Sequence, residues 1–309
     1  MENKIPLKSA LHHWWPACVS KHWEGEDGKV GWLKPDGTHL RLASHRLGAI
    51  GNGHLIKLGH GGAPSHWDES FESEFDDADT HFPTFIDWLE QLPREELGAS
   101  AGLRDRYMPV ETTEQELLRA VECVVSLAVR SPMNREASVS LAERLRGGSL
   151  PRPEREALMG LNIRRQQKLI VNDIGTRAKF VVMFSPNKEF LFGDGFYHNV
   201  SYARPPLTTV EILAPITPWI SVLICRHRQY MKNPQLTSIV LTDAEIDGLN
   251  LAIQVYSRNA IYFRNALPIP HEAYLTGQHR KFADTDNAVS YLIHGTPGIP
   301  ALGHSLFGL

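Results

Sequence analysis

The sequence predicts an α+β fold, a single domain over residues 1–309 in which an antiparallel sheet from the N- and C-terminal thirds accompanies a helical middle. Three observations predict it: a hairpin signal near residue 35, helical periodicity after residue 113, and strand-like segments after residue 178. Hydrophobic residues make up 42% of the chain and charged residues 22%, which is typical of a globular protein with a sizeable core.

The N-terminal third begins its pattern at residues 11–16, which read LHHWWP. Residues 7–24 are expected to form a short helix or turn that carries the two histidines. Residues 29–33 and 38–42 flank a Lys-Pro-Asp-Gly turn, in which proline presets φ and Gly37 can take the positive φ that closes a hairpin. The glycine-rich residues 48–66 lack the features of a phosphate-binding loop, so we expect a loop there.

An acidic segment follows at residues 69–79. A solvated surface segment is the simpler interpretation. A divalent-cation site is the alternative, although the ligand spacing of a known calcium loop is absent. A helix is then expected from Thr84, because Phe85, Trp88, Leu89 and Leu92 share one helical face.

The middle of the chain is expected to be helical. Thr113 and Glu116 form a capping box ahead of a long apolar stripe, and Pro132 should end that helix at or before Ser131. Two more helices are predicted, one at residues 137–146 closed by a Gly-Gly pair and one from Pro153.

The last third changes its periodicity. Strands are predicted at residues 178–184 and 189–192 with a turn between them, and again at 210–213 and 219–224. Thr242 and Glu245 open a long helix whose apolar stripe runs to Phe263. Residues 266–309 are rich in His, Pro and Gly and are expected to pack irregularly.

Composition restricts the functional classes. The formal net charge of −3 gives no global attraction to nucleic acid or anionic membranes, although a local basic patch remains open. No apolar run approaches the ~20 residues of a membrane helix, and residues 1–6 have no apolar signal core, so we expect a cytoplasmic protein without membrane contact. Three isolated cysteines are expected to be small core residues.

Polar residues from separate segments form the candidate site. His12 and His13 supply two titratable rings beside Trp14 and Trp15. Arg130 and Arg135 bracket a helix end, where such a pair can hold a carboxylate or phosphate or, alternatively, act as helix-end cations. Asp194 lies between two glycines at a strand end, and this pattern serves either a cleft or a plain turn.

Several short motifs resemble the bacterial family known as domain of unknown function 4238, which is marked by an N-terminal His-His-x-x-Pro and by Ser-Asp-Asn-Pro after a strand. The motifs occur in order at residues 11–16, 129–135, 190–194, 213–218, 249–250 and 256–257. This chain has Gly-Asp-Gly-Phe at 193–196, which keeps Asp194 but not its Ser, Asn and Pro neighbours. The resemblance implies candidate positions, Asn250 among them, and no activity.

The leading hypothesis is a hydrolase of a phosphodiester or nucleotide, a nuclease-type toxin or phage-defence effector. His12 and His13 would carry protons, Asp194 would orient one ring, and Trp14 would stack a base. Arg130, Arg135 and Asn250 would bind the nucleic acid or nucleotide substrate.

Two alternatives stay open. One is a metal-dependent hydrolase whose ligands are His12 or His13 with Asp194 and His198, although Gly195 argues against a helical turn there. The other is a binding protein without catalysis, in which the same His, Asp and Arg residues form a buried polar network. The sequence specifies no cofactor.

Overall fold

The computed structural model describes residues 11–59, 65–95, 101–200, 210–227, 230–278 and 288–300. The fold is a mixed α+β arrangement with a helical middle, as predicted. No helix among these residues is both long and apolar enough to cross a membrane.

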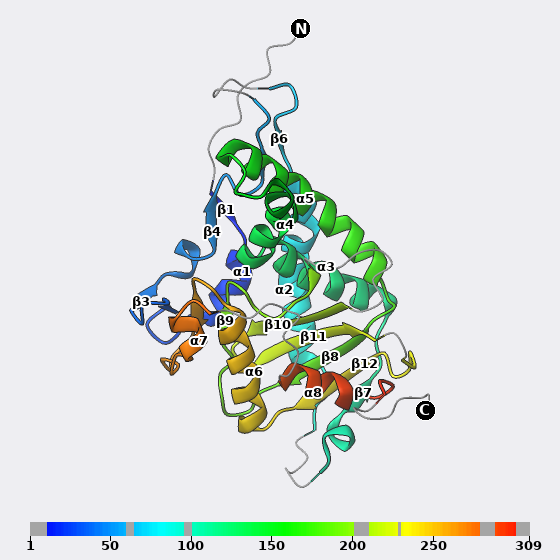
Figure 1. Ribbon diagram of the computed structural model, residues 1–309. Helices are drawn as coiled ribbons and strands as arrows, with labels where there is room; N and C mark the ends of the chain where they lie inside the picture. Colours follow the sequence, from blue (N-terminus) through cyan, green and yellow to red (C-terminus); the bar gives the residue numbers. More distant parts are fainter. Residues whose placement is uncertain are drawn as a thin grey trace.

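A five-stranded sheet lies at the centre of the molecule, in the order β10-β11-β8-β12-β7 (Figure 1). Its strands are β7 (Met108–Val110), β8 (Lys179–Phe184), β10 (Val210–Thr217), β11 (Ile220–Arg226) and β12 (Leu236–Val240). All neighbours are antiparallel except β8 and β12, which run parallel. Every residue of β8 is buried, because helices or strands cover both of its faces.

A four-stranded antiparallel sheet joins the two ends of the chain. Its order is β3 (His39–Leu42), β2 (Val30–Leu33), β13 (Ile261–Phe263) and β9 (Phe192–Gly193). The N-terminal hairpin is confirmed, and Gly37 has a φ of +80° at its turn. A Cβ at Gly31 would lie 2.3 Å from the Phe263 ring, so this position needs glycine for β2 and β13 to pair as they do.

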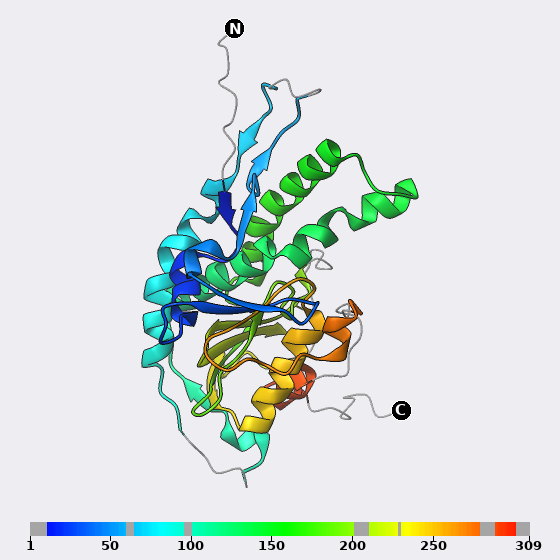
Figure 2. The ribbon, with the colours of Figure 1, turned by 90° about the vertical axis from the view of Figure 1, so that its left-hand side faces the viewer.

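Four longer helices cover the top and one side of the sheets, with α2 running down along that side in Figures 1 and 2. They are α2 (Asp76–Gln91), α3 (Glu114–Arg130), α4 (Pro132–Arg146) and α5 (Arg152–Ile174). The capping box predicted at Thr113 is present in full, since its side chain accepts from the Glu116 N–H and the Glu116 carboxylate accepts in return. Beside the sheets, on their right in Figure 2, lie α6 (Asp243–Tyr256), α7 (Glu272–Leu275) and α8 (Ala288–Gly295).

Short elements surround the N-terminal end of the helical layer. β1 (Leu11–His13) pairs with β4 (Ala49–Gly51), and β5 (Leu55–Ile56) pairs with β6 (Glu69–Ser70). The remaining short helices there are α1 (Ala17–Ser20), η1 (Lys21–Trp23), η2 (Ser44–Arg46) and η3 (Glu72–Phe75). Another short helix, η4 (Leu103–Arg106), lies apart from them and packs against α8. Residues 48–59 therefore contain two short strands in addition to loop.

Several boundaries differ from the prediction. The histidine pair lies on strand β1, because pairing with β4 fixes an extended backbone there. Helix α2 begins at Asp76 instead of Thr84, since acidic side chains favour a helix N-terminus and Phe82 is buried on its face. Helix α4 begins at Pro132 instead of residue 137, because Ser131 caps it.

The last third also departs from the prediction. β8 and β9 belong to different sheets, so residues 185–188 do not join a hairpin. Helix α6 ends at Tyr256, and the residues expected to continue its stripe form strand β13 because they pair with β2 and β9. The described part of the expected irregular tail contains α7 and α8.

Candidate functional site

The two histidines of β1 face opposite sides of the strand, because successive residues of a strand alternate. His12 is buried, with 2% of its surface exposed. His13 is half-buried, and its Nε2 lies 3.2 Å from the carbonyl oxygen of His45. The two rings therefore do not form one acid–base pair.

The His12 ring meets two side chains from later segments. The ring of His54, which directly precedes β5, lies with its centroid 4.8 Å away. The Oε2 atom of Glu72, the first residue of η3, lies 3.5 Å from His12 Nε2. One potential ligand atom of each residue lies within 4.8 Å of the others, and no second such group of three occurs among the described residues. We call His12, His54 and Glu72 the histidine cluster.

The floor of the histidine cluster is aromatic. The His54 ring lies 5.5 Å from the Phe71 ring and 5.0 Å from the Phe75 ring, between centroids. Both phenylalanines are buried, whereas the Glu72 side chain is 58% exposed. The cluster is thus closed on its inner side, and its carboxylate faces solvent.

Burial keeps both imidazoles of the cluster neutral. It lowers the pKa of His54 to about 2, and the positive charge of Arg130 adds to this effect. Burial also lowers the pKa of His12, against the opposing pull of Glu72. The Nδ1 atoms of both rings are buried and have no hydrogen-bond partner within the described part of the chain. An unsatisfied buried polar atom typically costs about 1–3 kcal/mol of stability, so both atoms require an explanation.

Arg135 supplies positive charge beside the cluster. Its Nη1 donates to the carbonyl oxygen of Gly53 at 2.8 Å, next to His54. Its charge contributes to the lowered pKa of both His12 and His54. No carboxylate among the described residues forms an ion pair with Arg135, although burial lowers its pKa to about 10 and leaves it charged at neutral pH.

Arg130 is bound internally. Its guanidinium donates to both carboxylate oxygens of Asp79, at 3.0 and 2.6 Å, and to Ser126 Oγ at 2.5 Å. It also lies over the Phe75 ring, 4.7 Å from the centroid. With only 1% of its surface exposed, Arg130 supports the floor of the cluster and has no free face for a phosphate.

Asp194 lies in a different network. Its carboxylate accepts hydrogen bonds from the backbone N–H groups of Arg258 and Asn259 and from Asn259 Nδ2, at 2.8–3.1 Å. Burial raises the pKa of Asp194, and these hydrogen bonds oppose that rise. The carboxylate thus fixes the turn between α6 and β13.

Asn250, Trp14 and His198 also have internal partners. Asn250 holds the chain before β9, since its side chain accepts from the Leu191 N–H and donates to the Glu189 carbonyl. Trp14 is 4% exposed and packs 5.9 Å from the Phe192 ring. His198 Nε2 lies 2.9 Å from Ser131 Oγ. The metal set of His12 or His13 with Asp194 and His198 is not assembled.

Of the predicted site residues, the structure therefore brings His12 and Arg135 together. The prediction did not include His54 and Glu72 in the site. His54 lies in the glycine-rich residues 48–66, where a loop was expected. Glu72 lies in the acidic residues 69–79, where a divalent-cation site was the alternative interpretation. The density of histidines before residue 82 was the available signal.

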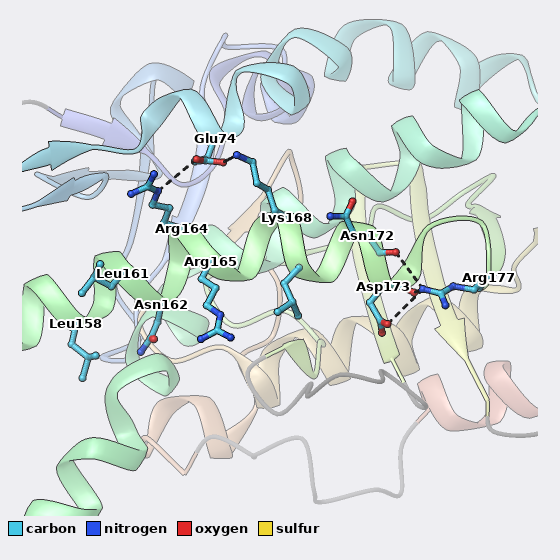
Figure 3. Close-up of a pocket in the computed structure, with 11 residues that line it drawn as sticks. Glu74, Leu158, Leu161, Asn162, Arg164, Arg165, Lys168, Asn172, Asp173 and Arg177 are labelled. Carbon is cyan, nitrogen blue, oxygen red and sulfur yellow. Dashed lines mark hydrogen bonds and ion pairs between the residues drawn. The ribbon is translucent and has the colours of Figure 1, made fainter.

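A separate groove of about 1020 Å³ runs along α5 (Figure 3). Arg164 and Lys168 reach from α5 to Glu74, which lies on η3 two residues after Glu72. At the other end Arg177 pairs with Asp173. Arg165 is exposed and carries no interaction drawn in Figure 3. Three of the four cations that line the groove pair with described carboxylates, and the lining carries more cations than carboxylates.

No protein-family model matches the chain, and no match was found among curated proteins or solved structures.

Proposed function

We propose that this protein hydrolyses a phosphate ester, the class that includes nucleotides and the phosphodiesters of nucleic acids, at the histidine cluster. The observation that carries the proposal is the Arg135 guanidinium beside two neutral imidazoles, without an ion pair to a described carboxylate. A planar guanidinium binds phosphate oxygens in a bidentate manner, so Arg135 suits an anionic substrate.

Each residue has a part in this chemistry. Arg135 holds the phosphate and offsets the negative charge that grows on it in the transition state. The imidazoles accept hydrogen bonds that orient a water molecule, and the exposed Glu72 carboxylate accepts its proton. Arg130 positions the cluster through Phe75, which contacts the His54 ring. The cluster contains His54 and Glu72 where the sequence hypothesis expected His13 and Asp194.

The groove along α5 favours an extended anionic substrate. It reaches η3 through Glu74, and Arg165 adds a cation that pairs with no described carboxylate. Phosphate contacts by lysine and arginine supply most of the sequence-independent affinity for nucleic acid. RNA and DNA therefore belong among the substrates to be tested.

The test measures kcat/KM on bis(p-nitrophenyl) phosphate, p-nitrophenyl phosphate, nucleotides, RNA and DNA. We expect Arg135→Ala to lower kcat/KM at least ~100-fold, as the loss of a charge-stabilising donor does. Arg144→Ala is the matched control, because Arg144 is an exposed arginine on the same helix. Equal activity of the two variants would contradict the proposal.

A binding protein without catalysis is the second candidate. Three of the predicted site residues form hydrogen bonds within the protein, as expected of a buried polar network: Asp194, Asn250 and Arg130. Absence of turnover on every substrate above, with folded protein supplied with divalent metal, would favour this candidate.

A further inference from the structure

We infer that His12, His54 and Glu72 bind one transition-metal ion, with Zn²⁺ the best match. This inference goes beyond the proposed hydrolysis, because it concerns binding that is measured without substrate. The three residues come from β1, from the residue before β5, and from η3, and the fold alone brings them together.

The geometry of the cluster is close to that of a coordination site. Two ligand atoms that bind a tetrahedral Zn²⁺ at about 2.1 Å lie about 3.4 Å apart. His12 Nε2 and Glu72 Oε2 are 3.5 Å apart, and the whole set of ligand atoms lies within 4.8 Å. Glu72 is exposed and can turn inward, whereas Phe71 and Phe75 fix the His54 ring. Only small side-chain movements separate this arrangement from coordination.

The donor atoms select the kind of metal. Two imidazole nitrogens and one carboxylate oxygen suit Zn²⁺ and Fe²⁺, whereas Mg²⁺ and Ca²⁺ prefer sites made of oxygen. Each residue offers one ligand atom to the same point, and His12 does so through the Nε2 atom that lies beside Glu72.

The site would keep an open position. Three protein ligands with a solvent-facing side are the pattern of catalytic zinc sites, in which water takes the fourth place. The exposed Glu72 gives the cluster that solvent-facing side, and Arg135 adds positive charge beside it. A bound ion would therefore lie where an anionic ligand could reach both the metal and Arg135.

The experiment uses the full chain without a polyhistidine tag, stripped with a chelator and then titrated with Zn²⁺ against a chromophoric competitor. Co²⁺ serves as a second probe, since its visible absorption reports coordination geometry. We expect one ion per chain. Loss of second-shell groups costs 10–100-fold in metal affinity, so removal of a direct ligand should cost at least about 100-fold.

Two matched pairs of variants locate the ion. Glu72→Ala should weaken Zn²⁺ binding, whereas Asp77→Ala, which removes an exposed carboxylate at the start of α2, should not. His12→Asn should weaken binding, whereas His13→Asn should not. Circular dichroism and melting temperature check that each variant is folded, and the exposed position of Glu72 keeps the test valid if His12→Asn unfolds.

Failure to bind Zn²⁺ or Co²⁺, or equal affinities within each pair, would overturn the inference. Tight Zn²⁺ binding without hydrolysis leaves the metal site standing and removes the proposed activity. Hydrolysis by stripped protein that binds neither Zn²⁺ nor Co²⁺ would leave the proposed activity standing and remove the metal site.

Discussion

Asp194 and Glu72 both carry carboxylates, but Asp194 is buried and Glu72 is exposed, so the two have different roles. Asp194 is 3% exposed, and backbone and side-chain N–H groups surround its oxygens. Glu72 is exposed, and its carboxylate lies 3.5 Å from the neutral His12 ring. The buried carboxylate stabilises a turn, whereas the exposed one is free to bind a ligand.

Replacement of Asp194 should therefore affect stability and leave hydrolysis unchanged. Asp194→Ala removes the carboxylate that accepts from the N–H groups of Arg258 and Asn259, so we expect a loss of ~1–3 kcal/mol in the free energy of unfolding. Asp194→Asn should lose less, because one acceptor oxygen remains. Urea unfolding measures the loss. Wild-type stability with abolished hydrolysis would instead assign Asp194 to the catalytic machinery.

At the scale of elements, Ser131 joins two helices and caps both of them. It is the C-cap of α3 and the N-cap of α4, with its Oγ donating to the Ala128 carbonyl and accepting from the Asn134 N–H. The junction places two arginines in different surroundings. Arg130 is the last residue of α3 and is buried in the core, whereas Arg135 lies in α4 and donates to the Gly53 carbonyl. The end of α3, which was predicted from Pro132, therefore allows α4 to place Arg135 beside the histidine cluster.

The cap makes a measurable contribution. We expect Ser131→Ala to lower the free energy of unfolding by ~1–2 kcal/mol, because N-cap replacement removes an acceptor for a helix N–H. The matched control is Ser140→Ala, an exposed serine within α4 whose replacement should change stability by less than ~0.5 kcal/mol. Equal melting temperatures of the two variants would show that Ser131 does not act as a cap.

At the scale of the whole molecule, His198 joins the sheet to the helical layer. Its backbone forms a bridge with Ile212 of β10, and its ring contacts Ser131 between α3 and α4. Burial lowers its pKa to about 3. The folded state therefore excludes a proton that the unfolded state binds below pH ~6.5.

This exclusion makes stability depend on pH. The contribution of His198 is fully present above pH ~6.5 and is lost as the pH falls toward 3, at up to ~1.4 kcal/mol per pH unit. The free energy of unfolding of wild type should thus fall more steeply between pH 6 and 4 than that of His198→Gln. Urea titrations at several pH values measure both slopes. Parallel slopes would mean that His198 is protonated in the folded protein.

The sequence by itself determined the elements that depend on near neighbours. The hairpin around Gly37 and the capping boxes at Thr113 and Thr242 were predicted correctly, because their hydrogen bonds join residues a few positions apart. The helix stop at Pro132 was predicted for the same reason. The α+β class followed from these local signals.

Only the tertiary structure decided which polar residues meet. His12, His54 and Glu72 lie on three short segments whose packing depends on α5 and on pairing between β1 and β4, and no local pattern encodes that arrangement. Sequence patterns also could not separate Asp194 from Glu72, since the two differ in burial, and burial is set by contacts between distant segments. Long-range packing is the physical reason that the elements could be predicted and most of the candidate site could not.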